Sequence, residues 1–287
     1  MRYDRPTDLA EALAIRAERR VVLMAGGTDI YPAFAQRKAW GDASRADILD
    51  LSALPGLDAI TEDEASWRIG SMVTWAALAD APLPALFDGL KEASRHVGGQ
   101  QVQNRGTLAG NLCTASPAGD GIPNLMALDA EVELSSQAGR RLLPVADFLT
   151  GYRQVALRPD EIVTALVVPK GPPARAAFVK LGARHSLVIS IAMVAAIVEL
   201  DAQDRIAAAR IAIGACSPVA LRLPGLEAAL AGERLATAPR RVEAAHLAHL
   251  VPISDVRASA EYRREVALHL VRDALTRIHQ ETARRAA

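Results

Sequence analysis

The sequence is poor in the residue types that mark several classes of protein. Its 287 residues include 2 cysteines, Cys113 and Cys216, too few for an iron–sulfur cluster or a structural zinc site. Aromatic residues make up 4%, which argues against a surface that stacks nucleic-acid bases. Lys+Arg and Asp+Glu both number 33, so no net charge draws the chain toward nucleic acid or membranes. The simplest interpretation is a cytosolic protein with reduced thiols.

Long hydrophobic runs are missing as well. The most apolar run, residues 187–200, contains Ser190 and ends near Glu199, so it predicts buried core and no membrane span. The first residues, Met1 to Pro6, lack the hydrophobic core of a secretion signal. We therefore expect a cytoplasmic location.

Recognisable catalytic motifs are also absent, since the sequence has neither a Gly-x-Ser-x-Gly elbow nor a His-Glu-x-x-His motif. His246 and His249 lie three residues apart on a helix expected near residues 240–249, so they could offer two metal ligands. No third ligand is near, and a solvated helix face is the better interpretation. Cys113 has no neighbouring base, which favours packing over nucleophilic catalysis. We assign no catalytic side chain and no metal ligand.

Among the features that are present, two glycine-rich segments are the most informative. The first follows an expected buried strand, residues 21–24, and reads Ala25-Gly26-Gly27-Thr28-Asp29 before an expected helix from Ile30 to Lys38. A strand, a glycine turn and a helix together present free amides to a phosphate. The segment is neither the dinucleotide fingerprint nor a P-loop. The alternative is a tight turn that needs glycine only for its geometry.

The second glycine-rich segment runs from Gly98 to Asp120 and holds five glycines. Its spacing fits neither a helix nor a strand, so we expect a long irregular stretch, and such stretches are commonly functional. Glycines would let backbone amides approach an anion, while hydroxyl and amide side chains could contact a sugar or a ring edge. A surface loop is the alternative. Together the two segments predict a phosphate-bearing ligand that itself supplies redox chemistry.

The remaining pattern predicts an α+β chain in three domains. Pro55-Gly56 and Gly171-Pro172-Pro173 mark the boundaries, which gives domains at 1–55, 56–173 and 174–287. The last domain is expected to hold a three-stranded antiparallel sheet covered by helices. Its expected strands are residues 176–181, 189–200 and 206–216, and its final helix runs from Ser259 to Gln280.

The two segments resemble the FAD-binding medium subunit of the molybdenum hydroxylases, the family of xanthine dehydrogenase and carbon monoxide dehydrogenase. The likeness rests on Ala25–Asp29 and Gln103–Asp120, and extends to Arg2–Asp8, Phe178–Arg184 and Asp255–Arg263, so it covers nearly the whole chain. It implies a non-covalent FAD held by a two-lobed domain of the vanillyl-alcohol-oxidase (PCMH-type) fold, with the C-terminal domain behind it.

The resemblance also implies which residues hold the FAD. The pyrophosphate side would be Leu23, Met24, Ala25, Gly26, Gly27, Thr28, Asp29 and Ile30. The second wall would be Thr107, Gly110, Asn111, Thr114 and Asp120, with Val97, Gly98, Val102 and either Ile162 or Val163 packed nearby. Lys180 matches a family lysine near the flavin, where a cation would stabilise the anionic reduced ring. A solvated strand lysine is the alternative.

As partners, the resemblance implies a molybdopterin-binding large subunit and a two-iron two-sulfur small subunit, assembled as a dimer of heterotrimers. Electrons would pass from the clusters to FAD and on to NAD, quinone or oxygen. NAD-using relatives often have an aromatic residue where Val97 stands, so the acceptor stays open. One alternative is a free-standing flavin oxidoreductase of the same fold, supported by Lys180 and Arg184. Another is a scaffolding subunit without flavin, against which Gly26, Gly27 and Asn111 argue.

Overall fold

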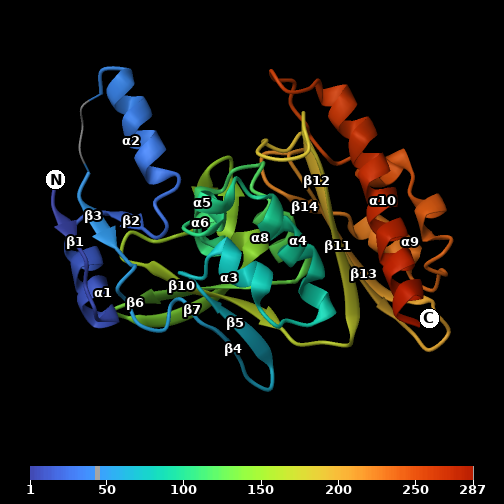
Figure 1. Ribbon diagram of the computed structural model, residues 1–287, viewed down its shortest axis with the longest axis horizontal. Coiled ribbons are helices and arrows are strands. Elements are labelled where there is room, and N and C mark those ends of the chain that lie inside the picture. The colour runs from blue at the N-terminus through green and yellow to red at the C-terminus, as the bar shows by residue number, and fades with distance from the viewer. Residues whose placement is uncertain (43–45, 287) are drawn as a thin grey trace.

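The computed structural model describes residues 1–42 and 46–286, which form three main sheets in the order of the sequence. The N-terminus and the C-terminus lie at opposite ends of the molecule (Figure 1). The first sheet is parallel and orders its strands β1 (Tyr3–Asp4), β3 (Ile48–Asp50) and β2 (Val22–Met24). The mixture of helix and sheet agrees with the expected α+β class.

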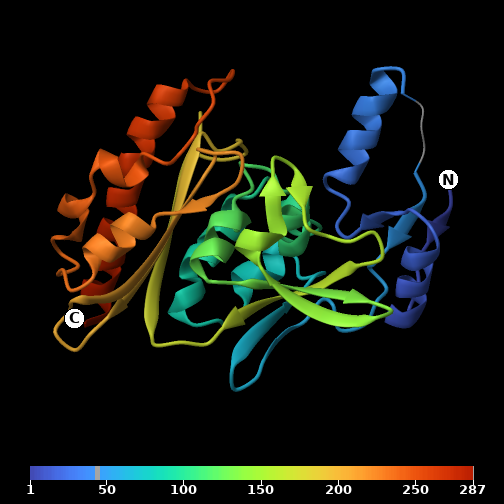
Figure 2. The same cartoon turned by 180° about the vertical axis from the view of Figure 1, so that it is seen from behind.

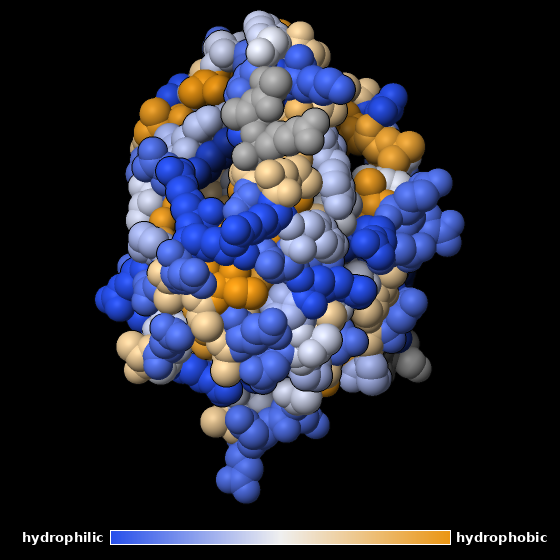
Figure 3. Space-filling model, turned by 90° about the vertical axis from the view of Figure 1, so that its left-hand side faces the viewer, coloured by the Kyte–Doolittle hydropathy of each residue, from blue (hydrophilic) through white to orange (hydrophobic). Residues whose placement is uncertain are grey.

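Two helices of very different burial belong to this first region. Helix α1 (Leu9–Glu18) begins at Asp8, whose carboxylate accepts a hydrogen bond from the Glu11 amide at 3.1 Å. It buries Ala12 and Leu13 in a small core with Leu49. Helix α2 (Ile30–Ala39), expected from the sequence, has no buried residue and projects away from the sheet (Figure 1). The face on this side of the molecule is mostly hydrophilic, with scattered apolar residues (Figure 3).

The second sheet is antiparallel and lies in the middle of the molecule. Its strands run in the order β4 (Ile60–Glu62), β5 (Ser66–Gly70), β10 (Ile162–Pro169), β6 (Glu131–Ser136) and β7 (Gly139–Pro144). The helical elements α3 (Trp75–Asp80), η1 (Ala85–Phe87), α4 (Asp88–His96) and α8 (Val145–Phe148), and the ribbon β8 (Leu149–Gly151) and β9 (Gln154–Val155), complete this region. Trp75, Phe87 and Phe148 are fully buried in its core.

The second glycine-rich segment is more regular than we expected. It forms α5 (Gln100–Gln103) and α6 (Leu108–Thr114), and leads into α7 (Gly121–Ala127). Thr107 starts α6 because its hydroxyl accepts a hydrogen bond from the Gly110 amide at 3.0 Å. The expectation of an irregular stretch was wrong because helices of 4 to 7 residues span too few turns to show an apolar period.

The third sheet is antiparallel and has four strands, not the three expected: β11 (Ala174–Leu181), β12 (Ala192–Leu200), β13 (Ile206–Gly214) and β14 (Leu221–Arg222). The extra strand has 2 residues, too few for an alternating pattern. Helices α9 (Pro224–Leu230) and α10 (Ala260–Ala286) cover one face, and α4 and α7 pack on the other (Figures 1 and 2). We call residues 174–286 the C-terminal region.

Two further findings concern helices. The helix expected near residues 240–249 is instead two short 3-10 turns, η2 (Ala238–Arg241) and η3 (Ala244–Leu247). The extended backbone of Val242, between η2 and η3, interrupts a longer helix. Across the described part of the chain, no helix combines the length and apolarity that a membrane crossing requires.

Candidate functional site

The two glycine-rich segments face each other across a cavity of about 570 Å³, within the size range of cofactor pockets. We call them the first wall (residues 23–30) and the second wall (residues 106–120). The lining includes most of the residues expected at the site: Leu23, Ala25, Gly26, Gly27, Thr28, Asp29, Ile30, Val97, Val102, Thr107, Gly110, Asn111 and Thr114. The structure therefore gathers in one cavity residues that lie up to 147 positions apart, from Arg16 to Val163.

The two walls are in direct contact through Gly26. A Cβ placed on Gly26 would lie 1.8 Å from the carbonyl oxygen of Arg105 and 3.0 Å from Cα of Gly106. Glycine is therefore needed here because the backbone at Arg105 and Gly106 leaves no room for a side chain. A bound ligand is not required to explain it. Thr114 also reaches across, since its hydroxyl lies 3.4 Å from the carboxylate of Asp29. Gly27 serves the turn itself, with a φ of +73°.

The first wall offers backbone donors to the cavity. Among the described residues, none accepts a hydrogen bond from the amides of Gly26, Gly27, Thr28 or Asp29. These amides lie in the turn that opens α2, where a helix N-terminus favours negative charge. Backbone donors without a protein partner are uncommon, and a group of them at a helix start fits a pyrophosphate.

Ser71 supplies a second sign that a polar ligand belongs here. Its hydroxyl is buried, lines the cavity and has no hydrogen-bond partner among the described residues. Such an atom costs free energy unless a ligand or water satisfies it. The sequence analysis missed Ser71 because nothing in its local pattern distinguishes it; the end of β5 brings it to the cavity. The other lining residues that were not proposed are Arg16, Val21, Leu51, Trp75, Gly106, Ala109, Cys113 and Leu157.

Five of the expected site residues do not line the cavity, and one of them is Gly98, which has a φ of +56°. Met24 and Ile162 point into the protein core, with exposures of 6% and 0%, while their neighbours Leu23 and Val163 line the cavity. Successive residues of a strand face opposite sides, so only one of each pair can face a ligand. Of the two alternatives left open by the sequence, Val163 is the one at the cavity.

The remaining two, Asp120 and Lys180, are bonded to each other at the end of the second wall. The Lys180 ammonium lies 2.5 Å from one carboxylate oxygen of Asp120, and the Ser190 hydroxyl donates to the other at 2.6 Å. The side chains of Lys180 and Asp120 are 9% and 6% exposed. A solvated strand lysine is therefore excluded, and contact of Lys180 with a flavin stays a prediction.

Arg16 brings a positive charge to the cavity. Its guanidinium donates to the backbone carbonyls of Glu161 and Val21 at 3.2 and 2.9 Å. Burial lowers the pKa of Arg16 from its ordinary value, but an arginine stays charged in proteins. A positive charge that lines the same cavity as these amides adds to the attraction for an anionic ligand.

The remaining candidate groups do not suit catalysis or metal binding. Burial raises the pKa of the Cys113 thiol to about 12, so it is neutral and a poor nucleophile. His246 accepts a hydrogen bond from the amide of Glu243, and His249 lies 3.1 Å from the carbonyl of Arg222. Over the described residues, no group of three His, Cys, Asp or Glu could hold a metal ion.

Known proteins share both the sequence and the fold of this chain. A family model described as the FAD binding domain in molybdopterin dehydrogenase matches residues 1–171, and one described as the CO dehydrogenase flavoprotein C-terminal domain matches residues 177–278. The chain is 33% identical over 279 residues to the nicotine 6-hydroxylase medium subunit of Paenarthrobacter nicotinovorans, covering 95% of each. It is 31% identical over 286 residues to the xanthine dehydrogenase FAD-binding subunit of Escherichia coli O157:H7, covering 97% of this chain and 94% of that one.

Among solved structures, the reconstituted CO dehydrogenase from Oligotropha carboxidovorans contains a chain that superposes with a TM-score of 0.89 at 27% identity. The superposition covers 97% of both chains.

Proposed function

The chain belongs to the family of FAD-binding subunits of molybdenum-containing hydroxylases and dehydrogenases, and from that premise we propose that it transfers electrons within such a complex. It is an oxidoreductase subunit whose cofactor is FAD. In our proposal it takes electrons from the iron–sulfur clusters of a partner subunit and passes them to an external acceptor.

The observation that carries this proposal is the cavity between the two walls. The amides of Gly26 to Asp29 would hold the pyrophosphate, with the Arg16 charge nearby. Thr107, Gly110, Asn111 and Thr114 would form the opposite side, and Val97, Val102 and Val163 would contact the rings. Bound FAD would supply the electron-transfer chemistry that no side chain of the cavity offers. The residues that would hold these lining residues in place without lining the cavity themselves are Met24, Asp120, Ile162 and Lys180.

The proposed architecture follows the three sheets. The first lobe, residues 1–55, and the second lobe, residues 56–173, would enclose the FAD in a vanillyl-alcohol-oxidase-like fold, with residues 174–287 as a separate domain. Support for the two lobes comes from the placement of the cavity between the first sheet and the helices on the second.

The proposed partners are a molybdopterin-binding large subunit and a two-iron two-sulfur small subunit, arranged as a dimer of heterotrimers. Their support is that relatives are named as medium chains or as subunits of dehydrogenase complexes. NAD, quinone or oxygen would be the acceptor. We place the assembly in the cytoplasm because both cysteines of this chain, Cys113 and Cys216, are unpaired, as is usual in a reducing compartment.

Electron transfer through this chain is tested by reduction of its flavin. The full-length chain, loaded with FAD, is mixed with the reduced two-iron two-sulfur subunit, and the absorbance of oxidised flavin is followed by stopped-flow spectroscopy. We expect the flavin to be reduced only when the partner is present and to be released intact on denaturation. A folded chain that binds no FAD would refute the proposal. Turnover of a small substrate by the isolated chain would favour a free-standing flavin oxidoreductase instead.

A further inference from the structure

Helix α7 links the second wall to the C-terminal region. All seven of its residues are buried, and it begins directly after Asp120, where the second wall ends. It packs against β12, β13 and β14 on one side and against α4 and α6 on the other. A helix in this place can transmit the position of the C-terminal region to the cavity.

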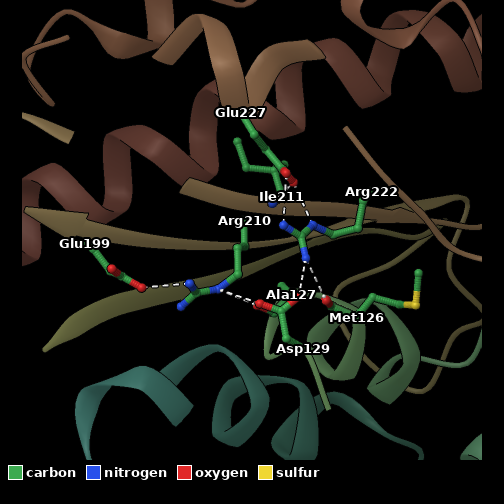
Figure 4. Close-up of polar contacts among 8 residues, drawn as sticks. All are labelled: Met126, Ala127, Asp129, Glu199, Arg210, Ile211, Arg222 and Glu227. Carbon is green, nitrogen blue, oxygen red and sulfur yellow. Dashed lines mark hydrogen bonds and ion pairs between the residues drawn. The ribbon is translucent and has the colours of Figure 1, made fainter. Parts of the chain in front are cut away.

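Two arginines of the C-terminal region bind the C-terminal end of α7 (Figure 4). Arg222 on β14 donates to the carbonyl of Met126 at 3.1 Å, and Arg210 on β13 donates to the carbonyl of Ala127 at 3.0 Å. Both also face Asp129, at 2.7 Å from Arg222 and 3.5 Å from Arg210. The last carbonyls of a helix lack partners within the helix and carry its negative dipole end, so paired guanidinium groups stabilise this end.

Each arginine is held in place by a carboxylate of its own region (Figure 4). Glu227 on α9 binds Arg222 through both oxygens, at 2.6 and 2.9 Å, and also accepts from the amide of Ile211 at 2.8 Å. Glu199 on β12 binds Arg210 at 2.7 Å. These bonds fix the direction of both guanidinium groups, so they act as parts of the sheet and not as mobile surface side chains.

The N-terminal end of α7 is also held by the C-terminal region. Asp120, which precedes the helix, is bonded to Lys180 on β11 and to Ser190 just before β12. Nearby, the amide of Ala215 donates to the carbonyl of Pro117 in the second wall at 2.8 Å. The C-terminal region therefore holds α7 at both ends.

The position of α7 determines the position of Asn111 at the cavity. The amide of Gly121, the first residue of α7, donates to the side-chain oxygen of Asn111 at 3.2 Å. The backbone is packed closely here, since a Cβ on Gly119 or Gly121 would lie 3.1 Å from the same oxygen. A shift of α7 would therefore turn or displace the Asn111 amide.

We propose that Arg222 and Arg210 are positioning residues for the cofactor site, acting through α7 on Asn111. This inference rests on the proposed function in one respect, that Asn111 belongs to the FAD-binding wall. It predicts that charges remote from the cavity control FAD affinity, and that they lose this control when Asn111 is removed.

A double-mutant cycle on the full-length chain tests the inference. The dissociation constant for FAD is measured for the wild type, Arg222→Gln, Asn111→Ala and the double variant. We expect each single change to weaken binding about tenfold, and the double variant to be no more than about twofold weaker than the weaker single variant. Independent effects would multiply to about a hundredfold, and that result would overturn the inference.

Two further variants separate positioning from general damage. Glu227→Gln leaves Arg222 in place but loosens it, so we expect a smaller loss of FAD affinity in the same direction, which also covers the case in which Arg222→Gln does not fold. Arg241→Gln removes an arginine whose ion pair with Glu233 lies on the surface, and should leave FAD binding unchanged. If Asn111→Ala has no effect, the proposed site itself is wrong. If Asn111→Ala weakens binding and neither Arg222→Gln nor Glu227→Gln does, only this inference fails.

Discussion

The helices that follow the two walls of the cavity differ in almost every respect. Helix α2 follows the first wall and has ten residues, none of them buried, whereas α7 follows the second wall and has seven residues, all of them buried. The first wall therefore takes its shape from the strand before it, from its own turn and from its contacts with the second wall at Gly26 and Asp29. The second wall takes its shape from what packs around α7, which includes the C-terminal region.

Local features contribute to the stability of α2. Arg37 lies over the ring of Phe34 at 5.2 Å, and Arg37 and Lys38 place positive charge in the last turn, where the helix dipole favours it. An isolated helix of this length is marginal in water. One wall of the cavity is therefore shaped mainly by residues near it in the sequence. The other is shaped by packing against the C-terminal region, which is distant in the sequence.

The largest expected effect comes from separating the two walls. Gly26→Val would place a side chain where the Arg105 carbonyl now lies, 1.8 Å from the new Cβ, so one backbone must move. We expect FAD affinity to fall by at least about a hundredfold. Because Gly106 packs against the buried Trp75, the free energy of unfolding should fall as well. Isothermal titration with FAD measures the affinity, and circular dichroism checks the fold.

The matched control for that variant is Gly225→Ala. A Cβ on Gly225 meets no atom within 4 Å, and the residue lies in α9, where alanine is favoured over glycine by about 0.5–1 kcal/mol. FAD binding should be unchanged and the free energy of unfolding slightly higher. Unchanged FAD binding by Gly26→Val would show that the walls need not touch.

A smaller effect tests the difference in burial directly. Leu125 in α7 is fully buried, so Leu125→Ala should lower the free energy of unfolding by about 2–5 kcal/mol. Phe34→Ala on α2 removes a larger side chain from a helix with no buried residue. This variant should change the free energy of unfolding by about 0.5 kcal/mol or less. Urea denaturation of the two variants, followed by circular dichroism, measures both values. Equal losses would mean that a partner or another surface covers α2.

The contrast between the walls also explains how far the sequence could predict this structure. The first wall was readable because a buried strand, a glycine pair and a helix follow one another within 20 residues, and the expected helix from Ile30 to Lys38 agrees with α2. The glycines of residues 98–120 predicted the second wall, and the family resemblance supplied the FAD and the roles of the individual residues. Both predictions depend on short, contiguous patterns.

Long-range packing could not be read in the same way. Helices α5 and α6 are too short to show a period, and β14 has 2 residues. Ser71 reaches the cavity only through the pairing of β5 with β10, and Asp120 meets Lys180 across 60 positions. The roles of the individual site residues stay predictions until FAD binding is measured on variants.

The smallest expected effect concerns Cys113, which lies on the second wall. Because burial raises the pKa of this thiol to about 12, about one molecule in ten thousand would carry the thiolate at pH 8. Iodoacetamide should therefore label Cys113 slowly in the folded chain, with a rate that rises about tenfold per pH unit, and rapidly after unfolding in urea. Cys113→Ala should change FAD affinity by less than about threefold, since the thiol has no charge or strong hydrogen bond to offer. Mass spectrometry of the labelled peptide measures the rate. Because Cys113 lines the cavity and is only partly buried, rapid labelling at pH 8 would show that its thiol ionises more readily than its burial indicates. The second wall would then be packed less closely around Cys113 than around α7.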